Sequence, residues 1–128
     1  MSAPVSDPAA AGRAPLSRDE ARGLLSEALA MSAADRTSVV LEARDESLTR
    51  FANNEIHQNV TSRQHTLTLQ AIVGRRRGIA STSRLDSSAL RQVADRALAL
   101  ARLSPEDEGL PPPAAPAEAP PLAAFVAA

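Results

Sequence analysis

The sequence contains no cysteine, no lysine, no tryptophan and no tyrosine. Without cysteine there are no disulfides, thiolate zinc ligands or cysteine nucleophiles, and without lysine there is no Schiff-base chemistry on a side-chain amine. The formal net charge of −1 gives no overall field that would attract nucleic acid or an anionic membrane. A length of 128 residues allows one domain with tails.

Long apolar runs are missing as well. The first 15 residues lack the basic start and the apolar stretch of a secretory signal, and no segment approaches the ~20 apolar residues of a membrane span. We therefore expect a soluble cytoplasmic protein. Residues 1–16 are rich in alanine, proline and serine without a period, which predicts a disordered tail.

Two segments have the apolar period of an amphipathic helix. The first begins at Ser17, which forms a capping-box sequence with Glu20, and it continues to Met31. The second begins at Asp86, a residue type favoured as N-cap, and ends at Leu103 before a Ser-Pro dipeptide. The expected buried stripes are Ala21, Leu24, Leu25, Ala28 and Leu29 in the first helix and Leu90, Val93, Ala94, Ala97, Leu98 and Ala101 in the second.

Between these helices, apolar and polar residues alternate as they do in half-buried strands. Asn53-Asn54 should form a two-residue hairpin turn, because asparagine tolerates a positive φ better than other non-glycine residues. Residues 45–47 and 74–78 supply further turns, and Phe51 should fill the core between the sheet and the helices. The expected strands are residues 37–45, 48–52, 55–61, 65–73 and 79–82.

This order of elements predicts an α+β fold, in which an N-terminal and a C-terminal helix pack on one face of an antiparallel β-meander. The domain should span residues 17–105. Residues 106–128 are rich in proline and alanine, which predicts a semi-rigid linker. Because the last residues become apolar again, we expect the linker to lead towards a domain that is missing from this chain.

Candidate binding residues gather after the Asn-Asn turn. Glu55, His57 and Asn59 are two apart, so on a regular strand they share a face that could contact a second subunit or an extended peptide. Glu55 and His57, with His65 from the next strand, could also supply three zinc ligands. Both histidines stand in polar positions that should be exposed, and no further carboxylate follows at a metal-ligand spacing. Solvated histidines are the simpler interpretation, and we expect no catalytic residue and no metal in this chain.

Three arginines, Arg75, Arg76 and Arg77, stand between two glycines at a predicted hairpin tip. Arginines in such a place could contact the phosphates of a nucleic acid. Single-strand binding relies on stacking aromatics, however, and the predicted domain has only Phe51. A solvated tip, or one that contacts a second domain or subunit, is the simpler interpretation.

Two motifs resemble the N-terminal domain of the TldD/PmbA family. RFANNEIHQN at residues 50–59 resembles the family's R-F-A-N-N-x-I-H-Q-N signature, and GRRRGIAST at residues 74–82 resembles its G-x-R-x-G-x-A-S-T hairpin. The resemblance covers about residues 17–113 and keeps both motifs in order. It implies a cytoplasmic zinc metallopeptidase system whose subunits form homo- or heterodimers and cleave peptides or unfolded segments.

The resemblance also implies a metal site on a His-Glu-x-x-x-His helix that lies C-terminal to this domain, and the sequence contains no such motif. We therefore expect the N-terminal domain of such an enzyme, with zinc bound only in the full-length family and no activity of this chain alone. One alternative is a free-standing adaptor that pairs with a full-length family member. Another is an RNA-contacting module that acts through the three arginines.

Overall fold

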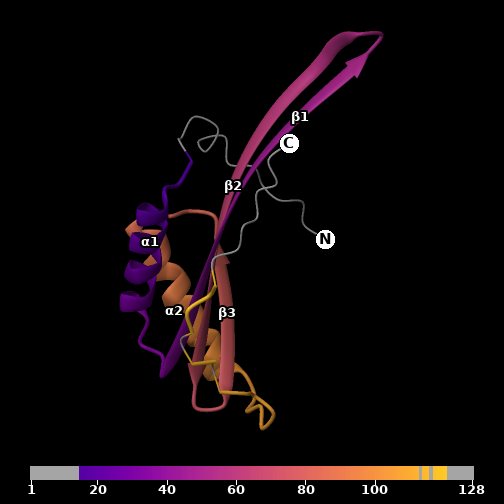
Figure 1. Ribbon diagram of the computed structural model, residues 1–128. Coiled ribbons are helices and arrows are strands. Elements are labelled where there is room, and N and C mark those ends of the chain that lie inside the picture. The colour runs from indigo at the N-terminus through magenta and orange to yellow at the C-terminus, as the bar shows by residue number, and fades with distance from the viewer. Residues whose placement is uncertain (1–14, 113, 116, 121–128) are drawn as a thin grey trace.

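The computed structural model describes residues 15–112, 114–115 and 117–120. The three strands form one antiparallel sheet in the order β1-β2-β3, and both helices lie on the same side of it (Figure 1). The predicted α+β meander with its helices on one face is confirmed. The disordered tail predicted for residues 1–16 falls almost entirely outside the described residues. The elements, in chain order, are α1 (Arg18–Met31), β1 (Arg36–Ala52), β2 (Glu55–Val73), β3 (Arg76–Thr82) and α2 (Ser87–Leu103).

The sheet has three strands where five were predicted, because β1 and β2 are each longer than expected. β1 continues through residues 45–47, which were expected to turn, and these residues pair with residues 61–63 of β2. Hydrophobic alternation marks a strand only where one of its faces is buried. The polar run Asp45-Glu46-Ser47 lacks this alternation and was therefore predicted as a turn. This part of the sheet is exposed on both faces, so the alternation is lost while the pairing continues.

The predicted hairpin turn between β1 and β2 is confirmed. Asn53 and Asn54 have φ values of 54° and 62°, the left-handed conformation that a two-residue turn between twisted antiparallel strands requires. Among the described non-glycine residues, these two alone have a positive φ. The amides at this turn are therefore explained by backbone geometry.

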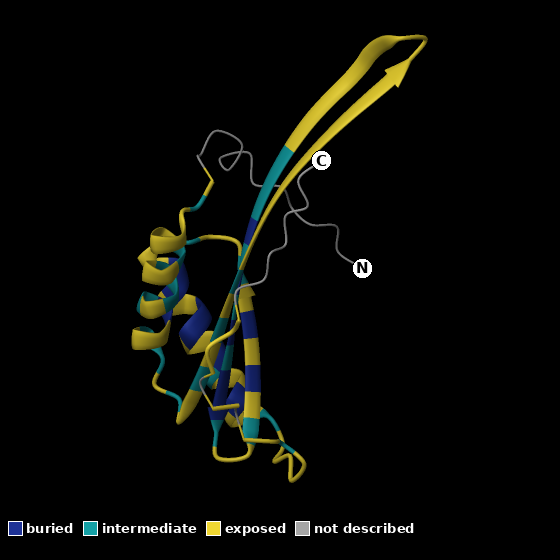
Figure 2. Ribbon diagram, viewed as in Figure 1, coloured by how far each residue is buried: buried dark blue, intermediate teal, exposed yellow. Residues whose placement is uncertain are grey.

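The core lies between the helices and one face of the sheet (Figure 2). On the sheet side Leu67, Leu69 and Ala71 are fully buried. The buried stripe predicted for α2 is confirmed apart from Leu98, which is half-buried. In α1 only Ala28 is buried, while Leu29 is 45% exposed, because this helix touches the core along a narrower strip than its apolar period suggests. The buried residues of α2 are Ala89, Leu90, Val93, Ala94, Ala97 and Ala101.

Small residues hold α2 close to the sheet. Gly78 of β3 is buried, and a Cβ atom placed on it would lie 2.1 Å from the carbonyl oxygen of Ala97 and 2.3 Å from the backbone nitrogen of Ala101. Real Cβ atoms do not come so near to backbone atoms. The alanines of α2 and Gly78 together allow helix and strand to pack backbone against backbone.

Both predicted helix caps are present. The backbone nitrogen of Glu20 donates to Ser17 Oγ at 3.2 Å, and the backbone nitrogen of Ser17 donates to Glu20 Oε2 at 2.8 Å, which completes the capping box of α1. At the start of α2 the Asp86 carboxylate accepts from the Ser88 hydroxyl at 2.6 Å and from the Ala89 nitrogen at 3.0 Å. These two bonds, the one from Ser88 most of all, hold the pKa of Asp86 below its ordinary value, because they favour the ionised carboxylate.

Candidate functional site

Beyond the helices, β1 and β2 continue as a two-stranded hairpin that projects away from the rest of the fold (Figure 1). We call residues 44–64 the arm. All of its residues from 44 to 61 are exposed (Figure 2). An isolated two-stranded hairpin is only marginally stable in water. Within the described structure, the outer part of the arm is therefore held chiefly by the pairing of its two strands.

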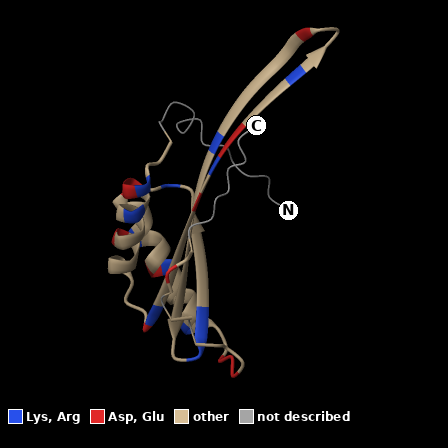
Figure 3. Ribbon diagram, in the orientation of Figure 1, with Lys and Arg blue, Asp and Glu red and all other residues tan. Residues whose placement is uncertain are grey.

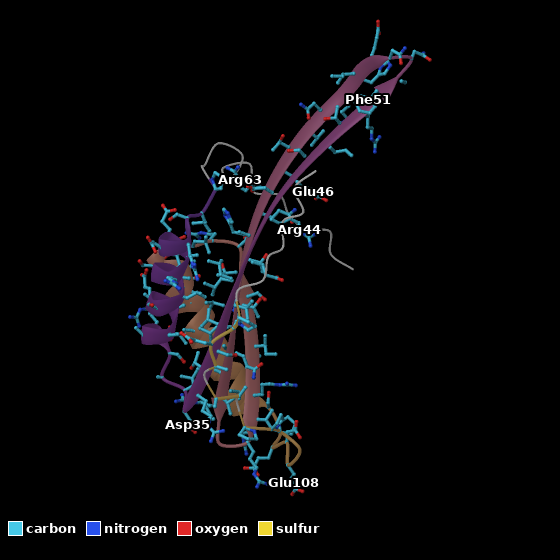
Figure 4. The ribbon with its side chains drawn as sticks, in the orientation of Figure 1. Asp35, Arg44, Glu46, Phe51, Arg63 and Glu108 are labelled. Atoms are coloured by element: carbon cyan, nitrogen blue, oxygen red, sulfur yellow. The ribbon has the colours of Figure 1, made fainter. Side chains whose placement is uncertain are left out.

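One face of the arm, the face that continues the helix-covered side of the sheet, carries polar cross-strand pairs. Arg63 Nε donates to Asp45 Oδ1 at 2.6 Å, near the place where the arm leaves the domain (Figure 4). Further out, the hydroxyls of Ser47 and Thr61 lie 3.4 Å apart. These side chains hold the two strands in register, because such pairs stabilise antiparallel strands.

Four large apolar side chains stand exposed along the arm. Leu48 and Val60 lie directly opposite each other and are 50% and 42% exposed. Phe51 and Ile56 form a second opposed pair and are 72% and 69% exposed. The two pairs lie on opposite faces of the arm, because Leu48 and Phe51 are three residues apart on β1. A single exposed apolar residue is ordinary, whereas each face of the arm exposes an opposed apolar pair.

The core position predicted for Phe51 is wrong. The side chain stands near the far end of the arm, well beyond the helices (Figure 4). The prediction assumed that the strand around Phe51 was short and lay under the helices. Because β1 is instead 17 residues long, Phe51 is carried past the end of the core.

The structure separates the residues predicted to share one face, Glu55, His57 and Asn59. The register shifts between Arg50, which pairs with Gln58, and Phe51, which pairs with Ile56, so His57 has no opposite residue on β1. Asn59 Oδ1 accepts from Thr49 Oγ1 at 3.3 Å, on the face that carries the polar pairs. Glu55 lies opposite Ala52, one residue from Phe51, and the alternation of β1 assigns it to the other face.

A zinc site built from Glu55, His57 and His65 does not fit this geometry. His57 and His65 lie on the same strand eight positions apart, which corresponds to about 26 Å. His65 was expected to be exposed but is 9% exposed, because it lies on the core side of β2 opposite Ala43. Among the residues that the structure describes, no group of three histidine, cysteine, aspartate or glutamate side chains could hold a metal ion.

The three arginines predicted at a hairpin tip do not form one exposed cationic cluster. The turn is shorter than predicted, since β3 begins at Arg76. Arg76 Nη1 donates to the carbonyl oxygen of Arg102 at 3.1 Å, and Arg76 Nη2 lies 3.8 Å from Glu106 Oε1. Arg75 and Arg77 remain exposed at the end of the sheet opposite the arm, where Figure 3 also shows acidic residues close by.

The segment after α2 returns to the sheet. The backbone nitrogen of Asp107 donates to the carbonyl oxygen of Arg75 at 2.9 Å. The segment lines one side of a pocket of about 180 Å³ on the face of the sheet away from the helices. Pockets for small-molecule ligands are usually about 300–1,000 Å³, so this pocket is too small to be the main binding site. Its lining includes Arg36, Gln70, Ile72, Arg77, Leu110 and Pro111.

No helix within the described ranges has both the length and the apolar character needed to cross a membrane.

Comparison with known proteins gave two matches of interest. Residues 37–101, just over half of the chain, match the profile described as PmbA/TldA metallopeptidase domain 1. The crystal structure of TldE from Thermococcus kodakarensis superposes with a TM-score of 0.55 at 22% sequence identity. The match covers 78% of this chain and 23% of that chain, so the present chain spans less than a quarter of TldE. At this identity the likeness concerns the fold.

Comparison with curated protein sequences gave no match.

Proposed function

Since the chain belongs to the PmbA/TldD family and forms its first domain, we propose that it serves as the docking domain of a zinc-dependent peptidase. In this role it binds a second subunit of the family through the arm and helps to guide an extended peptide substrate. The residues that hold zinc and cleave the peptide lie outside the described part of this chain. Zinc held there would supply Lewis-acid chemistry for peptide hydrolysis.

The observation that carries this proposal is the exposed arm. The rest of the domain has a closed core of its own, whereas both faces of the arm are open from residue 44 to residue 61. Its paired apolar side chains give each face one apolar contact of the kind found at the centre of protein interfaces: Phe51 with Ile56 on one face and Leu48 with Val60 on the other. The polar pairs around them keep the arm in a fixed shape before it binds.

Truncation of the apolar pair near the tip tests the docking role. In the variant Phe51→Ala/Ile56→Ala, binding to a complete subunit of the family should weaken about tenfold or more, because exposed aromatic and aliphatic anchors dominate interface energies. The dissociation constants of wild type and variant can be measured by calorimetry. The midpoint of thermal unfolding should stay unchanged, since both side chains stand outside the core.

Leu103→Ala is the matched control, because Leu103 is 83% exposed but lies at the end of α2, away from the arm. Its dissociation constant should stay within twofold of wild type. Equal affinities for wild type and the arm variant would contradict the docking role.

A zinc assay tests the separation of docking from catalysis. The purified 128-residue chain, supplied with zinc and an unstructured peptide, is expected neither to retain stoichiometric metal nor to cleave the peptide. The reason is that its described residues offer no set of three converging ligands. A complete family subunit with the same peptide serves as positive control. Bound zinc and cleavage that disappear in His57→Ala would contradict the proposal.

A further inference from the structure

β1 forms an edge of the sheet along its whole length, because the strand order is β1-β2-β3. It is 17 residues long and contains neither proline nor glycine. An edge strand exposes backbone N–H and C=O groups that pair readily with another strand, and proteins commonly block such edges with proline, with short strands or with a covering segment. Within the described structure, residues 44–52 of the arm have none of these three protections. Charged side chains can also guard an edge, and the arm carries them, so a partner strand must match their order.

The order of charges along this edge is self-complementary. On the face of β1 away from the helices, Glu46 stands two residues before Leu48 and Arg50 two residues after it. When a second β1 lies antiparallel with Leu48 opposite Leu48, each Glu46 faces an Arg50 of the second copy, and symmetry creates this pair twice. Opposite charges directly across two strands stabilise the pairing.

One apolar pair of the arm, Leu48 with Val60, also matches in this register. Val60 lies opposite Leu48 on β2, so the pairing would create a row of Val60, Leu48, Leu48 and Val60 across four strands. These side chains are 42% and 50% exposed in the single chain and would cover one another. On the other face, Ser47 would lie opposite Thr49 of the second copy and Asp45 opposite Phe51.

Neighbouring registers lose this match. A pairing centred on Ser47 places Arg44 opposite Arg50, and one centred on Glu46 places that carboxylate opposite itself. A pairing centred on Thr49 sets Leu48 against Arg50 and loses both the ion pairs and the apolar row. Like charges directly opposite destabilise a sheet, so the register centred on Leu48 is favoured among these.

We propose that the second subunit bound by the arm is another copy of this chain, paired edge to edge through β1 about Leu48. This rests on the proposed docking role of the arm and names its partner. The paired segment, residues 44–52, ends where the helices begin to cover the sheet, so neither domain obstructs the other. The product is a six-stranded antiparallel sheet with the helices of both copies on one face, because side chains of the same face meet across the new strand pair.

Single-cysteine variants test this register directly, because the natural chain has no cysteine that would react instead. In the proposed pair the two Leu48 Cα atoms lie about 4.5–5.5 Å apart, within the range for a disulfide. Under mild oxidation, Leu48→Cys should therefore form a covalent dimer of the full chain. The rate of dimer formation is measured on non-reducing gels.

Val40→Cys is the matched control. Val40 stands on the same strand and face and is 57% exposed, but in the proposed dimer the two copies of this residue are about 50 Å apart. Leu48→Cys should cross-link at least tenfold faster than Val40→Cys. Equal rates would show random collision and overturn the proposal.

Charge reversal gives a second test, which does not require a cysteine variant. Glu46→Arg places cations opposite one another and should weaken self-association about tenfold, measured by sedimentation equilibrium. The double variant Glu46→Arg/Arg50→Glu restores the opposite charges and should recover the wild-type association. Failure of the double variant to recover would overturn the register.

The same experiments separate this proposal from the docking role on which it rests. A chain that stays monomeric at all concentrations, yet binds a complete family subunit through Phe51 and Ile56, would overturn self-pairing and leave the docking role intact. A chain that does neither would overturn both.

Discussion

Replacing Gly78 with alanine is expected to lower the free energy of unfolding by about 3 kcal/mol or more. The new methyl group would meet the Ala97 carbonyl oxygen and the Ala101 nitrogen at distances shorter than van der Waals contact. Both are backbone atoms in the C-terminal half of α2, so no side chain can rotate away to make room. To accept the methyl group, α2 must move off β3 and open the core. For a domain of this size, such a loss corresponds to a decrease of about 12–24 °C in the unfolding midpoint, which calorimetry would record.

Gly23→Ala provides the matched control. Gly23 lies within α1, and a Cβ placed on it meets nothing within 4 Å. Alanine has the higher helix propensity, so this variant should be stabilised by up to about 1 kcal/mol. The same replacement of glycine by alanine is thus expected to lower the unfolding free energy at position 78 and to raise it at position 23. A Gly78→Ala variant as stable as wild type would show that α2 does not pack on β3 as closely as described.

Replacing Leu69 with alanine should cost about 2–5 kcal/mol of unfolding free energy. Leu69 is fully buried at the centre of the sheet, between Val39 of β1 and Ala80 of β3. Its neighbours across the core are largely alanines, which are too short to fill the space that the truncated side chain would leave. Small domains have a total stability of about 5–15 kcal/mol, so chemical denaturation should show a variant close to its unfolding threshold.

Leu103→Ala again gives the comparison, since it removes the same atoms from a residue that is 83% exposed. Its unfolding free energy should stay within about 0.5 kcal/mol of wild type. If Leu69→Ala and Leu103→Ala were equally mild, the core would not be centred on β2.

Local signals in the sequence identified most of the fold. Ser17 with Glu20 and Asp86 marked the starts of the helices, because caps depend on neighbouring backbone groups. Asn53-Asn54 marked the hairpin for a similar reason, since a positive φ is a local demand. The buried stripe of α2 could be predicted because an apolar period reports directly on which face of a helix is covered.

The arm could not be predicted in the same way. Hydrophobic alternation identifies strands that have one buried face. Residues 44–61 are exposed on both faces, so this signal is missing there. Phe51 was assigned to the core because a large aromatic residue in a small domain usually belongs there, and no local pattern gives the length of a strand beyond the core. The bulge at His57 is equally hidden, since it depends on the register between two strands.

Because β1 and β2 extend beyond the helices, substitutions in the two parts of these strands are limited by different requirements. Near the helices, substitutions in β2 are limited by stability, because Leu67, Leu69 and Ala71 fill the core. Along the arm, exposed side chains contribute little to the stability of the domain and are limited chiefly by what they contact. Partner choice can therefore diverge between relatives while the domain keeps its fold, since different residues of the same two strands determine each property.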